Sequence, residues 1–305
     1  MLSFNIARIG NALTPFSILL ILISALLHSS WNFFTKRGNL PVELFFWVFC
    51  CGVLLYLPFF IAFGVFPSFL LQTPPKLLGI IILSGIFETI YFISLIEAYQ
   101  VGDLSLVYPI SRSAPLFTQI WAIVFIGELL SSKGLIGIGL VMIGIFVVSL
   151  KDFRLKSVLL RCDHSSSHPY LLAFTAAIAS SIYSVIDKVG IQLTNPAFYL
   201  WSIDLWMCVF TGLYLFLRKG SCLLKVWRES KKEIFIVTIL QNLTYLLVLM
   251  ALQESKVSYV VAFRQVGVLF GVGMGAILLK ESYWKNRITG ALILTMGLVL
   301  IAFAK

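Results

Sequence analysis

Apolar and polar residues alternate along this chain in long blocks. The apolar blocks are each about 17 to 25 residues long and continuous, without the period-2 alternation of a membrane barrel strand. A helix that crosses a bilayer needs about 20 apolar residues. The pattern therefore predicts ten transmembrane helices, at about 15–35, 42–66, 77–98, 104–127, 134–150, 169–190, 197–217, 234–253, 257–279 and 288–304.

The breaks between these blocks carry charged or turn-forming residues. Two longer breaks, around 151–168 and 218–233, are strongly basic. We interpret them as solvent-exposed connections, and neither is long enough to form a separate domain.

The two halves of the chain resemble each other when one is shifted by 153 residues. The match is ungapped over the fourth and fifth blocks against the ninth and tenth. It aligns the pairs Glu128 and Glu281, Gly137 and Gly290, and Gly144 and Gly297. Two unrelated apolar stretches would not keep glutamates and glycines in register, so the chain contains an internal repeat.

Each copy holds five predicted spans, so the second copy enters the membrane from the opposite side. Two inverted copies related by a pseudo-two-fold axis are a transporter architecture, with the site near the midplane between them. We therefore predict an all-α integral membrane protein of two inverted five-helix repeats, at 1–152 and 153–305.

Composition supports this class and excludes others. Of the 305 residues 60% are hydrophobic and 12% are charged, whereas a soluble domain carries about 25% charged residues. A soluble enzyme, a disordered chain and a disulfide scaffold are excluded. We attribute the net charge of +10 to cytoplasmic loops and expect no nucleic-acid partner. Cysteines 50, 51 and 208 fall inside apolar blocks and are expected to pack as small apolar residues.

Three segments carry a family resemblance: LLHSSWNFFTKRG (26–38), LSLVYPISRSAPLFTQIWAIVFIGE (104–128) and KVSYVVAFRQVGVLFGVGMGAILLKE (256–281). They resemble the EamA-type branch of the drug/metabolite transporter superfamily over nearly the whole chain. The resemblance implies a basket-shaped, ten-helix carrier of small metabolites, often an exporter. That family spans amino acids, sugars, nucleotide sugars, organic phosphates and quaternary amines, so the resemblance leaves the substrate open.

Four charged residues fall near the middle of predicted spans: Glu88, Arg112, Asp204 and Arg264. Each costs about 2.5–3.5 kcal/mol to insert facing lipid. They must face a polar cavity or pair with one another, and both interpretations stay open. Glu128 and Glu281 sit between spans, where an acid stabilises the N-terminus of the next helix.

Helical spacing predicts which other residues share that cavity. In the first span His28, Trp31 and Asn32 recur on one face, and in the third Glu88 and Tyr91 do. The remaining candidates for binding substrate are Tyr108, Tyr183 and Gln241.

These residues favour a secondary transporter, an exporter or exchanger, of an amino acid or a related zwitterion or organic acid. Arg112 and Arg264 would hold a carboxylate, Glu88 an amine or a coupling proton, and Trp31 and Tyr91 the organic part. Glu88 with aromatic rings could instead hold a quaternary amine. A basic pocket also suits nucleotide sugars or other phosphorylated metabolites.

The sequence contains no catalytic motif. We expect a non-enzymatic protein without metal or cofactor. An intramembrane enzyme or a structural membrane protein is the alternative of another class. Partners are the lipid bilayer and a small-molecule substrate, and monomer and homodimer both stay open. We expect a plasma (cytoplasmic) membrane location. Of the 23 Lys and Arg residues, 15 fall in the loops on one side, which favours termini outside.

Overall fold

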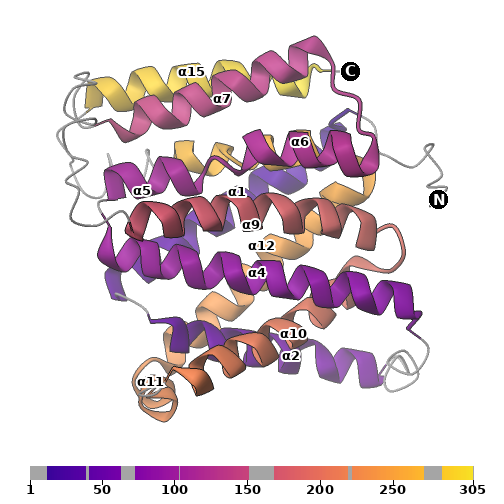
Figure 1. Ribbon diagram of the computed structural model, residues 1–305, viewed down its shortest axis with the longest axis vertical. Helices are drawn as coiled ribbons and strands as arrows, with labels where there is room; N and C mark the ends of the chain where they lie inside the picture. Colours follow the sequence, from indigo (N-terminus) through magenta and orange to yellow (C-terminus); the bar gives the residue numbers. More distant parts are fainter. Residues whose placement is uncertain are drawn as a thin grey trace.

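The computed structural model describes the backbone of residues 12–38, 41–62, 73–102, 104–150, 168–218, 222–270 and 284–304, and within these it describes no side chains at 31–38, 104–106 and 284–285. Its helices are α1 (Pro15–Gly38), α2 (Val42–Ala62), α4 (Pro75–Val101), α5 (Leu104–Ser111), α6 (Ala114–Ile126), α7 (Ser132–Ser149), α9 (His168–Gly190), α10 (Pro196–Leu217), α11 (Leu223–Glu229), α12 (Lys231–Glu254), α13 (Val257–Phe263) and α15 (Trp284–Ala302) (Figure 1).

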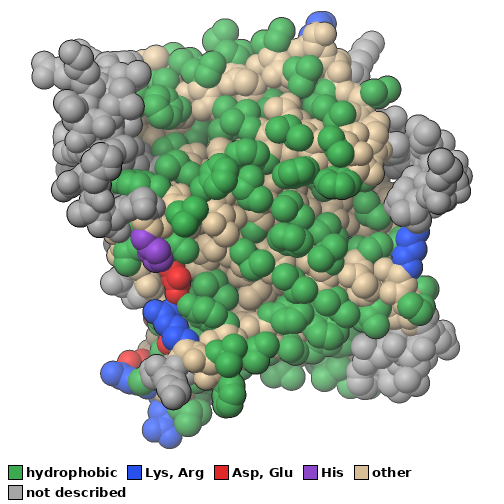
Figure 2. Space-filling model, viewed as in Figure 1, with side chains coloured by type: hydrophobic (Ala, Val, Ile, Leu, Met, Phe, Trp, Pro, Cys, Tyr) green, Lys and Arg blue, Asp and Glu red, His purple; other side chains and the backbone are tan. Residues whose placement is uncertain are grey.

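The described part of the chain is helical and suited to a bilayer. Six of its helices are long and apolar enough to cross a membrane: α2, α4, α7, α9, α10 and α12. Shorter apolar helical stretches lie at 15–30, 257–270 and 286–302. Large apolar side chains such as Phe125 and Phe216 project outward, and Figure 2 shows a broad apolar face with charged side chains at its margins. The all-helical membrane class is thus confirmed, while the count of ten spans stays a prediction.

Helices of the first half pack on helices of the second half in reciprocal pairs. The 153-residue shift relates α4 to α12 and α1 to α9, and the structure packs α4 against α9 and α12 against α1. It also packs α2 against its counterpart α10, and α7 against its counterpart α15 (Figure 1). Such reciprocal contacts are what a two-fold relation between two similar units produces.

The contact of α7 with α15 depends on four glycines that the repeat aligns. Gly137 faces the backbone of Gly297, and Gly144 faces that of Gly290 and Leu294. A Cβ atom on Gly144 would lie 2.6 Å from the Leu294 nitrogen. Small residues at such crossings let helix backbones approach closely in the absence of a hydrophobic driving force.

Two of the predicted spans are broken in the structure at equivalent places. The fourth block forms α5 and α6, which are separated by a turn at Arg112 and Ser113. The ninth block forms α13, a turn at Arg264 and Gln265, and a further helical stretch over 266–270. Breaks of this kind inside a membrane are tolerated only where they are buried in protein or line a cavity.

Glu128 forms hydrogen bonds between the two halves of the chain. Its carboxylate accepts hydrogen bonds from the Val257 amide at 2.7 Å and the Ser258 amide at 3.1 Å, and from the Ser258 hydroxyl. These amides begin α13, so the acid caps a helix of the other copy. The expectation that Glu128 stabilises the next helix in sequence was wrong, because the Ser131 hydroxyl caps α7 instead. Its repeat partner Glu281 lies outside the described residues.

We predict that Gly144→Ala destabilises the protein and that Gly139→Ala does not. A methyl group at 144 meets the α15 backbone, which cannot move aside as a flexible side chain can, and such overpacking costs about 1–3 kcal/mol. Gly139 lies on the same helix with nothing within 4 Å of a Cβ, so alanine there benefits from its higher helix propensity. The melting temperatures of both variants in detergent test this prediction. Equal melting temperatures for the two variants would contradict the close α7–α15 contact.

Candidate binding site

A cavity lies where the two helix breaks meet the middle of α1, α4 and α9. Polar and aromatic side chains supply most of its wall. Its lining comprises Ser24, Ala25, His28, Tyr91, Ser111, Arg112, Ala114, Ser180, Tyr183, Val261, Arg264 and Gln265. Five residues predicted to bind substrate are therefore brought together here from different helices: His28, Tyr91, Arg112, Tyr183 and Arg264.

Arg112 occupies the break between α5 and α6. Its Nη2 lies 3.2 Å from His28 Nε2, and its guanidinium lies over the Tyr108 ring, 5.4 Å from the ring centroid. Tyr108 is absent from the cavity lining. This predicted site residue therefore contacts the Arg112 guanidinium from outside the cavity and can fix its position.

Arg264 occupies the break after α13, the equivalent place in the second copy. Its guanidinium lies over the ring of Tyr245, 5.7 Å from the centroid. Within the described ranges, neither Arg112 nor Arg264 forms an ion pair with a carboxylate; the ion pair found there joins Arg218 and Glu97. Two arginines inside the membrane without an acidic partner among the described residues leave positive charge at the cavity that needs compensation.

The N-terminus of α6 adds to this positive potential. The helix begins at Ala114, which lines the cavity, and it continues for 13 residues to Ile126. The N-terminus of a helix carries a partial positive charge. Broken helices in transporters place such ends toward anionic substrate groups.

Three tyrosines form one continuous aromatic wall. The Tyr183 ring contacts Tyr91 and Tyr245 edge to face, with centroid distances of 5.6 and 6.2 Å. Tyr91 and Tyr183 line the cavity, while Tyr245 lies behind them, buried to 8% exposure. The wall is suited to packing the organic part of a small solute.

Three other predicted residues, Glu88, Asp204 and Gln241, are buried but do not line the cavity. Glu88 lies near Tyr245 and Asp187, outside the set of residues that line the cavity. The expectation that Glu88 and Arg112 share one cavity surface is not what the structure shows. Helix faces alone could not separate the two groups, because both lie on inward faces of their helices. The side chains of Trp31 and Asn32 lie outside the described residues.

Other residues of the lining were missed from the sequence. Gln265 is buried, and its Oε1 has no hydrogen-bond partner among the described residues. Ser24 lies one turn before His28, so the helical spacing of that face could have identified it. Ser111 and Gln265 adjoin the helix breaks, which an apolar block does not reveal.

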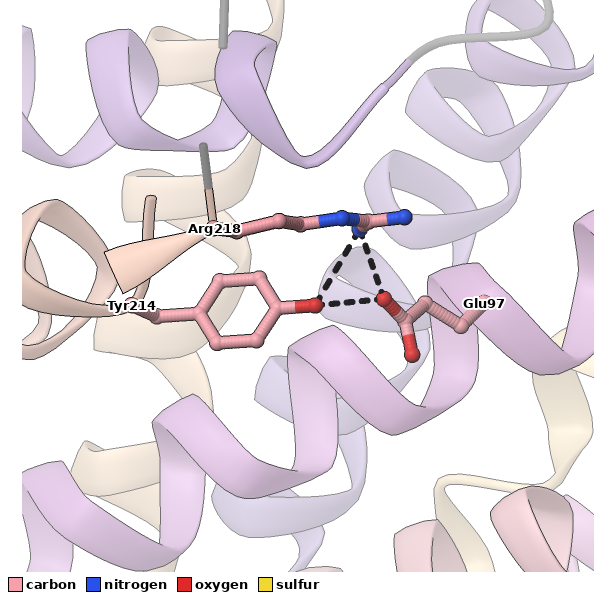
Figure 3. A network of polar contacts seen from close by, with 3 residues as sticks. All are labelled: Glu97, Tyr214 and Arg218. Atoms are coloured by element: carbon pink, nitrogen blue, oxygen red, sulfur yellow. Dashed lines mark hydrogen bonds and ion pairs between the residues drawn. The ribbon is translucent and has the colours of Figure 1, made fainter. Parts of the chain in front are cut away.

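A separate polar contact joins the two halves away from this cavity. Glu97 of α4 accepts hydrogen bonds from the Tyr214 hydroxyl at 2.5 Å and from Arg218 Nη1 at 2.8 Å (Figure 3). The Arg218 side chain is 59% exposed. Exposed pairs contribute about 0–1 kcal/mol, so this contact is easily broken and supplies a matched control for the buried arginines.

The reciprocal helix pairs, the two broken helices and the cavity between them define a membrane carrier of repeat architecture. The EamA-like transporter family model matches residues 15–150 and 168–303, and the chain belongs to this family. The predicted membership and the two repeats are thus confirmed. The protein is a multi-pass membrane transporter of the drug/metabolite type.

Two further comparisons agree with this class. An uncharacterized protein of Methanocaldococcus jannaschii is 29% identical over 138 residues, which cover 45% of this chain and 98% of that protein. A solved structure, described only as the crystal structure of a protein, superposes with a TM-score of 0.74. It is 17% identical, and the match covers 94% of this chain and 97% of that chain. This likeness concerns the fold alone.

We predict that a cysteine at position 180 reacts with a small charged thiol reagent and that a cysteine at 181 does not. Ser180 lines the cavity, whereas the neighbouring Ser181 is fully buried, with its hydroxyl bonded to Ile178 and to Trp121. We expect the reagent to label Ser180→Cys more than it labels the unaltered chain, as measured by mass spectrometry. Phe174→Cys, on the outward-facing side of α9, is the control for access through lipid. Equal labelling at 180 and 181 would contradict a water-accessible cavity.

Proposed function

We propose that this protein carries a small metabolite with an anionic group, an amino acid or a related zwitterion or organic acid, by alternating access around the central cavity. The observation that supports this most directly is the pair of arginines at the two helix breaks. Both face one cavity, and neither has an acidic partner among the described residues.

The chemistry of the lining favours a carboxylate. Guanidinium groups form short, charge-assisted hydrogen bonds to carboxylates and phosphates, often through two parallel N–H donors. A bound anion would also offset part of the cost of keeping two cations inside the membrane. We infer that solute binding at Arg112 and Arg264 stabilises the protein.

The rest of the lining can accept an ammonium group. Gln265 Oε1 lacks a partner in the part of the chain that the structure describes, and Ser24, Ser111 and Ser180 line the same space. Neutral acceptors of this kind suit the amine of a zwitterion. Glu88, which lies outside the lining, is less suited to this role than the sequence suggested.

The arrangement of the two copies supports alternating access. The cavity lies between residues of both copies, and transporters of inverted-repeat architecture move one unit against the other around such a site. We propose that the direction is export or exchange across the plasma membrane, in keeping with the expectation from the sequence.

Two other substrate classes make different demands on the cavity. A quaternary amine needs an acid among aromatic rings, and the described lining contains tyrosines but no acidic side chain. A phosphorylated metabolite would use the same two arginines as a carboxylate. The size and charge of the anion that binds therefore distinguish the second class.

The test is a thermal-shift screen of the purified protein against L-alanine, L-glutamate, succinate, glucose 6-phosphate and choline. A ligand that binds the folded state raises the melting temperature. We expect a shift from a carboxylate. Arg112→Ala and Arg264→Ala should each weaken its binding about 10- to 100-fold, since a hydrogen bond to a charged group contributes about 1.5–3 kcal/mol.

Arg218→Ala is the matched control for loss of one arginine and should bind as the unaltered protein does. A shift from glucose 6-phosphate alone would move the assignment to phosphorylated metabolites. A shift from choline alone that survives Arg112→Ala would overturn the anion site.

A further inference from the structure

Besides Glu128, which caps α13, three carboxyl groups lie buried in the described part of the bundle but outside the cavity lining. They are Glu88 of α4, Asp187 of α9 and Asp204 of α10, exposed to 4%, 0% and 1%. None forms an ion pair with a described Lys, Arg or His. A carboxylate desolvated without a cation is costly, so these groups require an explanation that helix packing does not give.

Asp187 is surrounded by neutral hydroxyl donors from three different helices. It accepts hydrogen bonds from Ser84 of α4, from Tyr245 of α12, and from Tyr199 of α10 at 2.9 Å. This arrangement satisfies an ionised carboxylate through oriented dipoles and not through a fixed positive charge. Because no cation of the described residues is paired with Asp187, protonation of its carboxylate would not leave a buried cation without a partner.

Glu88 lies next to this site. It follows Ser84 by one helical turn on the same face of α4, and Tyr245 neighbours both carboxyl groups. Glu88 Oε1 has no hydrogen-bond partner within the described ranges. Two carboxylates that share a low-dielectric site cannot both be ionised at modest cost. The pair can therefore hold one proton on one carboxyl group while the other carboxylate is charged.

We propose that Glu88 and Asp187 form a proton-binding pair that couples proton movement to transport of the anionic solute. This rests on the proposed function, because the solute is the anion held by Arg112 and Arg264. The proton is bound as O–H on one carboxyl oxygen and leaves to water, so no other reactant is needed.

Tyr245 connects the pair to the substrate cavity. Its hydroxyl donates to Asp187, and its ring lies beneath the Arg264 guanidinium. Through this position next to Tyr245, the positive charge of Arg264 would favour an ionised carboxylate at Glu88. An anion bound to Arg264 cancels that attraction, so proton and anion favour each other's binding, and the effect is reciprocal. The carrier would then move proton and anion together, in a direction set by their gradients.

Other charged and titratable groups face the pair from each surrounding helix. Asp204 of α10 is a further acid near Glu88. Tyr91 of α4 and Tyr183 of α9 line the cavity together with Arg112, whereas Glu88 and Asp187 do not. Lys188 is adjacent in sequence, but its Nζ donates to the carbonyls of Leu252 at 2.6 Å and Ser255 at 3.0 Å. Arg264 is thus the cation placed to influence the pair.

Infrared spectroscopy of the full-length protein tests the site with protons alone. The carbonyl stretch of protonated, buried carboxyl groups should appear, and the component that belongs to the pair should titrate with pH and be lost in Glu88→Gln with Asp187→Asn. Asp204→Asn, which removes one buried acid outside the pair, should retain it. If the paired variant does not fold, Tyr245→Phe remains decisive, because removing one hydrogen bond to Asp187 should move the band to higher frequency. A band unchanged in both variants would overturn the proposal.

Arg264→Ala tests the connection to the cavity without a solute. The band should titrate at higher pH in this variant, because the cation that favours the ionised pair is gone. Arg218→Ala, which changes a distant arginine, should leave the titration unmoved. Identical titrations in Arg264→Ala and the unaltered chain would overturn the link through Tyr245.

Proteoliposomes loaded at alkaline pH test the coupling itself, with labelled L-alanine and succinate as probes. An imposed pH gradient should raise uptake in the unaltered protein and have no effect in Asp187→Asn, which should still equilibrate the solute. Uptake that ignores the gradient in the unaltered protein would overturn the coupling. Absence of any uptake, with the titrating carboxyl band present, would instead overturn the proposed function and leave the proton site standing.

Discussion

A helix that breaks inside a bilayer must satisfy its own backbone, and this constraint shapes the centre of the molecule. Both breaks are closed in the same way, by hydrogen bonds between residues three apart. In the first copy the Ser113 amide donates to Ile110, and in the second the Gln265 amide donates to Ala262, each at 3.1 Å. The breaks are therefore well-formed turns. They leave side chains of the turn free to face the cavity, which is how two arginines come to lie at membrane depth.

The two copies share a scaffold but differ at the residues that carry chemistry. The 153-residue shift relates Arg112 to Gln265 and Ser111 to Arg264. The two cations thus come from adjacent, not identical, positions of the repeat. The same shift relates Glu88 to Gln241 and Asp204 to Cys51, so neither acid has an acidic counterpart in the other copy. A symmetric scaffold supports helix packing, while these differences give the cavity a cationic wall and place the acids on one side of it.

Much of this organisation could be read from the sequence. The repeat, the helical class and the family follow from the apolar blocks and from glycines and glutamates in register. Most of the buried charges were found because each is expensive in lipid. The sequence could not predict that the arginines line the cavity while the buried acids do not. Spacing shows which face of its own helix Glu88 occupies, but not that Arg112 lines the cavity while Glu88 does not. That requires knowing which helices are neighbours.

The tyrosine wall gives this separation a physical consequence. If Glu88 touched Arg112 directly, the two would neutralise each other and leave neither an anion site nor a proton site. The Tyr183 ring contacts Tyr91 and Tyr245 edge to face, and Tyr245 lies between the Arg264 guanidinium over its ring and Asp187 at its hydroxyl. Charges separated by a low-dielectric layer still influence each other over several ångströms. The wall therefore permits two ligands to bind at separate places and yet respond to one another, which coupled transport requires.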